Sequence, residues 1–162
     1  MLRLTRPFFI IITLIILFSS QSYAQKAPAF TLEGDKGKIS LSNYKNQVVY
    51  IDFWASWCKP CRKSFTFMNE MQDRYGKKGF KIIAINLDNE REAANDFLKK
   101  HPAKFSIAYD KDGKTPGLYK LKVMPTSYLI DRRGNLLNIH KGFKENQTNE
   151  LENLIIQALN KK

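Results

Sequence analysis

The chain is poor in cysteine, in acidic residues and in long hydrophobic runs. It has 2 cysteines in 162 residues, and 15 acidic against 27 basic side chains. It also has no internal repeat and no low-complexity tract, which argues against a repeat architecture. With 43% hydrophobic and 12% aromatic residues, a chain of this length can bury one core but has little room for two. A single domain is therefore expected.

The longest apolar run, Phe8–Phe18, is shorter than the roughly 20 residues that a membrane-spanning helix needs. Two arginines precede this run, and the small residues Ser22 and Ala24 stand at cleavage positions. The pattern predicts a signal peptide over residues 1–24 and a mature domain over residues 25–162. This domain would work in the periplasm or on the extracytoplasmic face of a bacterial inner membrane. An uncleaved segment is the alternative, and it would be the only part of the chain in contact with the membrane.

The excess of basic residues does not indicate a nucleic-acid partner. Residues 25–162 keep 25 of the 27 basic side chains and all 15 acidic ones, which is a net charge of +10. An exported protein rarely meets nucleic acid, and the lysines are scattered rather than aligned with aromatic residues. We expect a monomer with a solvated basic surface that favours acidic partners. The scattered lysines include Lys77, Lys78, Lys99, Lys100, Lys111, Lys114, Lys120 and Lys122.

Both cysteines lie in one short stretch, Trp-Ala-Ser-Trp-Cys-Lys-Pro-Cys-Arg, at residues 54–62. Outside the cytoplasm a disulfide usually serves as a structural staple. The stabilisation by such a staple shrinks as the closed loop shortens, and a bond from Cys58 to Cys61 restrains almost no chain. The spacing therefore favours reversible redox chemistry or metal binding over a structural disulfide.

The residues around the pair predict a strand-to-helix turn. Residues 47–54 form a nearly continuous apolar, β-rich run, which is typical of a strand covered on both faces. After the pair, apolar residues recur at helical spacing from Cys61 to Tyr75, and Gly76 then ends the predicted helix. Pro60 fits the first helical turn, because the N–H that proline lacks has no partner there.

A thiol at a helix N-terminus is stabilised as thiolate by unpaired N–H groups and by the helix dipole. Cys58 is the first and more exposed of the pair, and the Lys59 ammonium adds to the positive field. We therefore expect Cys58 to be the nucleophile, with a pKa below the usual value of about 8.5. Cys61 lies one turn further in, and we expect it to attack the mixed disulfide and release the reduced partner.

These motifs resemble a known family. The stretch Asp-Phe-Trp-Ala-Ser-Trp-Cys-Lys-Pro-Cys, the later Val-Met-Pro-Thr and Gly142 are similar to the thioredoxin superfamily, and in particular to its exported TlpA/ResA-like thiol-disulfide oxidoreductases. The resemblance covers essentially the whole predicted mature chain. It implies an α/β thioredoxin-like fold with a central mixed β-sheet flanked by helices. It also implies an N-terminal hairpin and an extra strand-helix insertion within residues 88–122.

The other expected elements follow from apolar periodicity and turn residues. A second buried strand should run parallel to the strand before the cysteines, with the cysteine helix connecting the two. The expected elements are a hairpin over 30–42, strands over 80–87 and 105–109, a helix over 90–100, a helical turn near Leu118, a second hairpin over 126–141 and a closing helix over 150–158.

Two further features are implied by the resemblance. Pro125 corresponds to a family proline whose peptide bond is cis and which lies against the cysteines, so that the backbone of Met124 can pair with a substrate strand. Without the family, a trans turn proline would be favoured. Trp57 is expected to form an apolar docking surface with Met124 and Gly142.

Asp52 is an acid inside the apolar strand, where burial of its charged form is costly and should raise its pKa. It precedes Cys58 by six residues, where thioredoxin carries a buried acid that relays a proton to the second cysteine. We expect the same role, with an ordinary hydrogen-bonded aspartate as the alternative. Many TlpA/ResA-like proteins instead carry a glutamate three residues after the second cysteine, where this chain has Ser64.

The resemblance implies an exported protein-disulfide oxidoreductase that cycles Cys58 and Cys61 between dithiol and disulfide without an organic cofactor or a metal. Reduction of protein disulfides is the expected direction, and oxidation is the alternative. The implied partners are disulfide-bearing exported proteins, such as an apocytochrome c, and a membrane thiol electron donor.

Other site classes are less favoured. A Sco-type copper module would use paired cysteines with a distant histidine, but its cysteines are spaced differently. A thiol peroxidase would want a lone reactive cysteine. A closed zinc site lacks a ligand pattern, because the two histidines are remote from the cysteines and from each other. For His101 and His140, surface or packing roles are favoured over catalysis.

Overall fold

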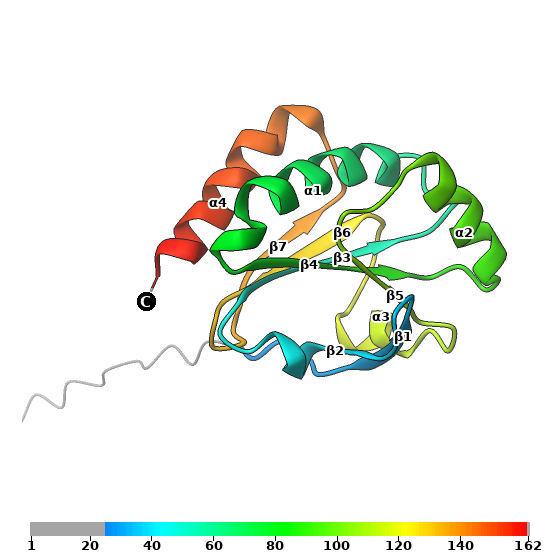
Figure 1. Cartoon of the computed structure of the whole chain (residues 1–162), viewed down its shortest axis with the longest axis horizontal. Helices are drawn as coiled ribbons and strands as arrows, with labels where there is room; N and C mark the ends of the chain where they lie inside the picture. Colours follow the sequence, from blue (N-terminus) through cyan, green and yellow to red (C-terminus); the bar gives the residue numbers. More distant parts are fainter. Residues whose placement is uncertain (1–24, 162) are drawn as a thin grey trace, which may run out of the picture.

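The structure is a computed structural model that describes residues 25–161, so the predicted signal peptide lies outside the described residues. The described part forms one mixed sheet with helices around it (Figure 1). Its elements in chain order are β1 (Thr31–Gly34), β2 (Ile39–Ser40), η1 (Leu41–Tyr44), β3 (Val48–Trp54), α1 (Cys61–Tyr75), η2 (Gly76–Lys78), β4 (Phe80–Asn86), α2 (Arg91–Lys100), β5 (Ser106–Tyr109), α3 (Lys114–Leu118), β6 (Thr126–Ile130), β7 (Leu136–Lys141), η3 (Glu145–Gln147) and α4 (Thr148–Asn160).

The sheet has the strand order β2-β1-β5-β4-β3-β6-β7. Strand β3 lies in the interior of the sheet, parallel to β4 on one side and antiparallel to β6 on the other. The connection from β3 to β4 runs through α1, as a crossover between parallel strands requires. The predicted parallel pairing and the mixed α/β class are therefore confirmed.

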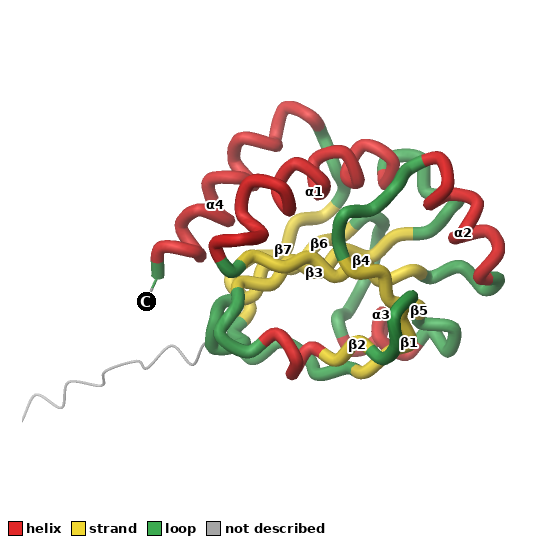
Figure 2. Tube along the Cα trace, viewed as in Figure 1, coloured by secondary structure: helices red, strands yellow, loops and turns green. Residues whose placement is uncertain are grey.

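Two layers cover the two faces of the sheet. Helices α1, α2 and α4 lie on one face, while η1, α3 and the β1–β2 end of the sheet, which curls round, lie on the other (Figure 2). The packing clusters agree, because Phe65 of α1, Phe97 of α2 and Ile155 of α4 belong to one buried cluster. Phe30 and Tyr119 belong to the other. We call these the helix side and the hairpin side of the sheet.

Strand β3 is buried along its whole length, and its side chains alternate between the two sides. Tyr50 and Trp54 belong to the cluster on the helix side, whereas Ile51 and Phe53 belong to the cluster on the hairpin side. This alternation places Asp52, which lies between Ile51 and Phe53, on the helix side beneath α1.

The predicted elements all occur, with ends that differ by one or two residues. The sequence patterns did not predict η1, η2 and η3, which are single short turns. They also did not predict that β1 pairs with β5, so that the N-terminal hairpin extends the central sheet. Within residues 25–161, no helix combines the length and the hydrophobicity needed to cross a membrane.

Candidate active site: a disulfide at a strand-to-helix turn

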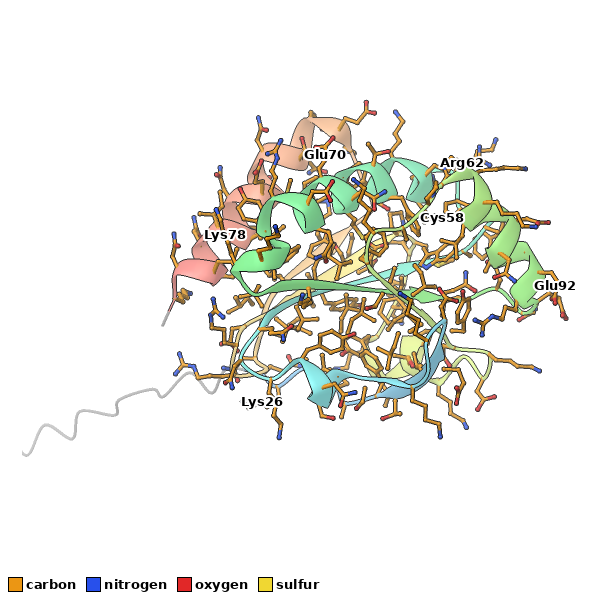
Figure 3. The ribbon with its side chains drawn as sticks, viewed as in Figure 1. Lys26, Cys58, Arg62, Glu70, Lys78 and Glu92 are labelled. Atoms are coloured by element: carbon orange, nitrogen blue, oxygen red, sulfur yellow. A yellow bond between two sulfur atoms is a disulfide. The ribbon has the colours of Figure 1, made fainter. Side chains whose placement is uncertain are left out.

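The two cysteines lie in a tight turn between the end of β3 and the start of α1. The Cys58 N–H donates to the Ala55 carbonyl at 3.0 Å, and the Cys61 N–H donates to the Cys58 carbonyl at 3.1 Å. Helix α1 begins at Cys61, with Pro60 as its N-cap residue. Figure 3 shows Cys58 and Arg62 at this end of α1, far from Lys78 beyond its other end. The predicted strand-to-helix placement is confirmed, although Pro60 lies just before the first helical turn.

A disulfide joins Cys58 to Cys61, with an S–S distance of 2.00 Å and 5.4 Å between the Cα atoms. The sulfur atoms therefore lie at the N-terminus of α1, where unpaired backbone N–H groups favour a negative charge. The two residues differ in access to solvent. Cys58 is 4% exposed and lines an open groove, whereas Cys61 is fully buried and does not reach it.

The groove next to Cys58 has a volume of about 450 Å³ and is formed by two loops. One is the turn that carries the cysteines, and the other is the segment that leads into β6. The side chain of Trp57 is 67% exposed at this groove, and Val123 is 49% exposed. Lys59 and Lys122 add positive charge to the walls. The lining residues are Trp57, Cys58, Lys59, Pro60, Leu121, Lys122, Val123 and Met124.

The Met124–Pro125 peptide bond, which precedes β6, is cis. The Gly142 N–H donates to the Pro125 carbonyl at 2.7 Å, and this contact joins the ends of β6 and β7 beside the groove. Gly142 adopts φ +77°, a left-handed conformation that favours glycine. The structure thus brings Trp57 and Met124 to the same groove. Gly142 is not among its lining residues and instead contacts the backbone of Pro125.

Asp52 is 1% exposed, and its Oδ2 atom makes no hydrogen bond within the described residues. Its neighbours across the sheet are Ala84 on β4 and Ser127 on β6. Burial raises the pKa of the Asp52 carboxyl well above its usual value. The side chain faces the cluster that also contains Cys61. An acid that readily holds a proton therefore lies beneath the helix that carries the second cysteine.

One group that the sequence analysis missed is Asp88, which lies beyond the end of β4. The Ser56 N–H donates to Asp88 Oδ2 at 2.9 Å, and the Ser56 hydroxyl donates to Oδ1 at 2.9 Å. The Asn86 amide donates to Asp88 Oδ2 at 2.8 Å. Asp88 therefore holds the turn two residues before Cys58. The sequence contained an indication of this contact. Asn86 and Asp88 lie at and just after the end of a strand predicted to run parallel to β3, and the carboxyl ends of parallel strands meet at the same edge of a sheet.

Three other residues singled out in the sequence make local packing or hydrogen-bond contacts. Trp54 is fully buried and packs against Phe65 at 4.9 Å between ring centroids. The Ser64 hydroxyl donates to the Cys61 carbonyl at 2.9 Å. His101 packs against the ring of Phe97 at 4.7 Å. In the part of the chain that the structure describes, no three His, Cys, Asp or Glu side chains are grouped so that they could hold a metal ion.

Known proteins resemble this chain in sequence and in fold. The Redoxin family matches residues 23–155. Thiol-disulfide oxidoreductase ResA of Bacillus thuringiensis is 39% identical over 119 residues, which are 73% of this chain and 69% of the relative. ResA of Bacillus subtilis is 32% identical over 84% of this chain and 77% of its own. A crystal structure assigned as thiol:disulfide interchange protein DsbE from Chlorobium tepidum has 50% identity and a TM-score of 0.83, and covers 84% of this chain and 96% of its own.

Proposed function

Because the chain belongs to the Redoxin family and is a ResA-like thiol-disulfide oxidoreductase, we propose that it works outside the cytoplasm as a reductant of protein disulfides. The observation that carries this proposal is the unequal access of the two sulfur atoms. Cys58 lines the open groove, and Cys61 is buried behind it. A thiol pair arranged in this way can perform two ordered steps with a large partner.

In the first step, the Cys58 thiolate attacks one sulfur of the substrate disulfide. A mixed disulfide forms between Cys58 and the substrate, and the other substrate sulfur leaves as a thiolate. The N-terminus of α1 and the exposed Lys59 ammonium stabilise the attacking thiolate. The groove gives the substrate an approach to Cys58 but not to Cys61.

In the second step, the Cys61 thiol loses its proton to Asp52 and attacks Cys58. The Cys58–Cys61 disulfide of the structure forms, the bond between Cys58 and the substrate breaks, and the second substrate sulfur leaves as a thiolate. Two electrons have then passed from the enzyme dithiol to the substrate. Asp52 suits this role because burial raises the pKa of its carboxyl well above the usual value, which makes it a better proton acceptor. No organic cofactor or metal takes part in these steps.

The groove fits an extended polypeptide segment. Val123 and Met124 line its wall, and Trp57 presents a large exposed ring. A substrate strand can pair with the backbone of Met124 while its cysteine reaches Cys58. Lys59 and Lys122 favour acidic residues next to that cysteine. An exported protein with a disulfide, such as an apocytochrome c before haem attachment, is the proposed substrate.

The cycle needs an electron donor that returns the Cys58–Cys61 disulfide to the dithiol. We propose a membrane thiol protein for this step and a monomeric enzyme in the periplasm or at the extracytoplasmic membrane surface. The basis for this location is the signal-like pattern of residues 1–24, together with the usual setting of exported thiol chemistry. Residues 25–162 would form the exported domain, without a nucleic-acid partner.

Two cysteine variants test the proposed roles. Cys58→Ser should abolish the reduction of insulin disulfides, because the nucleophile is lost. Cys61→Ser should also be inactive in turnover, but it should accumulate a mixed disulfide with the substrate, since Cys58 can still attack. Non-reducing gels and mass spectrometry distinguish the two. Full activity of Cys58→Ser would contradict the proposal.

The direction of the reaction has its own test. Equilibration of the purified protein with glutathione buffers measures the reduction potential of the Cys58–Cys61 pair. A value near thioredoxin's roughly −270 mV supports a reductant, and a value near roughly −120 mV would assign an oxidant.

A further inference from the structure

A row of polar side chains crosses the sheet beneath the active-site helix. Asp52 on β3 pairs with Ser127 on β6, and Ser127 pairs with His140 on β7. Directly opposed residues of antiparallel strands project to the same face. All three therefore lie on the helix side. On the other flank of Asp52, Ala84 of β4 has no polar side-chain atom, so the row extends from Asp52 only towards β7.

The row carries two buried polar atoms without a hydrogen-bond partner in the described residues, Asp52 Oδ2 and His140 Nε2. Between them, the Ser127 Oγ atom accepts a hydrogen bond from the Tyr50 hydroxyl at 2.6 Å. That bond leaves the Ser127 hydroxyl proton free to be donated further. Two opposed pairs separate the Asp52 and His140 backbones by about 10 Å, a gap that side chains and one buried water can bridge.

Burial decreases along the row. Asp52 and Ser127 are 1% and 3% exposed, whereas His140 is only partly buried. Strand β7 is the edge of the sheet, and its side chains on the face of His140 are only partly buried. The row therefore leads from the core beneath Cys61 to the surface of the molecule.

We propose that His140 connects the Asp52 carboxyl to solvent, so that a proton passes between them through Ser127 and a bridging water. This inference rests on the proposed function, because it gives Asp52 the proton exchange that the second step requires. Asp52 must be a carboxylate before it can accept the Cys61 proton. Asp52 is only 1% exposed, so its carboxyl has very little direct contact with bulk water through which to lose the proton that it already holds.

Asp52 passes its proton along the row to Nε2 of neutral His140, and His140 releases one proton to water from Nδ1. The Asp52 carboxylate then takes the Cys61 proton as Cys61 bonds to Cys58 and the substrate thiolate leaves. An imidazole suits this task, because its neutral form has one donor and one acceptor nitrogen. His140 is therefore a positioning residue for proton transfer, since it contacts neither sulfur nor substrate.

Few other titratable groups face the row. Tyr50 contributes its hydroxyl from the same strand as Asp52, and Cys61 of α1 belongs to the same buried cluster. Glu150 of α4 acts on His140 and opposes the effect of burial, which lowers the His140 pKa below its usual value. Burial therefore favours the neutral imidazole of His140, which is the form that can accept a proton.

The test is a double-mutant cycle on mixed-disulfide resolution. The reduced enzyme is mixed with a disulfide peptide, and single turnovers are followed between pH 6 and pH 9. His140→Gln keeps polarity but cannot relay a proton. It should slow resolution at pH 7 by about 10-fold, less than the roughly 100-fold that loss of a positioned general base costs. In an Asp52→Asn background, the same change should alter the rate by less than about twofold.

Controls separate this role from a structural one. His101→Gln changes the other histidine of the chain and should leave the rate within about twofold of wild type. Added imidazole should accelerate His140→Ala but not wild type. If His140→Gln does not fold, Ser127→Ala carries the same cycle with the same expected sign. Equal slowing by His140→Gln with and without Asp52, or no slowing at all, would overturn the proton path. Cys58→Ser would still be inactive in that case, so the proposed function would stand.

Discussion

The two sides of the sheet differ in how their buried polar groups are hydrogen-bonded. On the hairpin side, the Tyr119 hydroxyl donates to the Pro28 carbonyl and the Tyr128 hydroxyl donates to the Tyr119 carbonyl, each at 2.8 Å. On the helix side, atoms of Asp52, Trp54 and His140 are buried without a partner in the described residues. Buried polar groups are normally paired because an unpaired one costs stability. The paired tyrosines stabilise the hairpin side, whereas the helix side, where the Tyr50 hydroxyl is also paired, keeps the unpaired Asp52 oxygen near Cys61.

Strand β3 makes this contrast within two consecutive residues. Phe53 faces the hairpin side, where its ring lies 5.5 Å from that of Tyr119 and 5.8 Å from that of Tyr128. Asp52 faces the helix side with an unpaired oxygen. Substitutions at the two positions should therefore have opposite effects on stability and on activity.

The largest stability effect is expected on the hairpin side. Phe53→Ala leaves a cavity among aromatic rings and should lower the free energy of unfolding by about 3–5 kcal/mol. The activity of the molecules that remain folded should stay close to wild type, because no group on the helix side changes. Urea unfolding and insulin reduction below the transition measure the two quantities. A large loss of activity in the folded fraction would mean that the two sides are not independent.

Asp52→Asn should have the opposite effects, a loss of activity with a gain in stability. The reaction should slow by about 100-fold with the loss of a proton-transferring group, while stability at neutral pH should increase. Because burial raises the folded pKa, the folded state binds more protons than the unfolded state above the unfolded pKa of about 3.9. The stability of the wild type should therefore fall as the pH rises through this window, by about 1.4 kcal/mol per pH unit.

The asparagine side chain of this variant does not titrate, so Asp52→Asn should lack this slope, and its advantage should vanish below about pH 4. Urea unfolding at a series of pH values tests this expectation. A wild-type curve that rises with pH over the same range, or a variant that is less stable at pH 8, would mean that the Asp52 charge is compensated in the fold.

A smaller effect on stability and activity is expected at Asp88, which lies just beyond the end of β4. Asp88→Ala leaves the Ser56 N–H and the Asn86 amide without their acceptor and should cost about 1–3 kcal/mol. Activity should fall in the folded protein as well, because the turn before Cys58 loses its anchor. Asp96→Ala, which removes an exposed pair with Lys99, is the matched control and should change neither quantity. Unchanged kcat/KM in Asp88→Ala would show that the turn holds its shape without this contact.

Local patterns were sufficient to predict most of the fold and the centre of the site. The apolar run before the cysteines predicted β3, and the helical spacing from Cys61 to Tyr75 predicted α1 with the same bounds. Pro60 and the two cysteines followed from their place between these elements. These features depend on residues close together in the chain, where side-chain period and turn chemistry determine the conformation.

What the sequence by itself determined is therefore a strand, a turn and a helix that place two thiols at a helix N-terminus. Only the tertiary structure decided that Asp88 anchors Ser56, that Gly142 contacts Pro125 outside the groove lining, and that Asp52, Ser127 and His140 form one row. The physical reason is strand register. A shift by one residue would turn each side chain of the row to the other face of the sheet, and register depends on packing between segments that are distant in the chain.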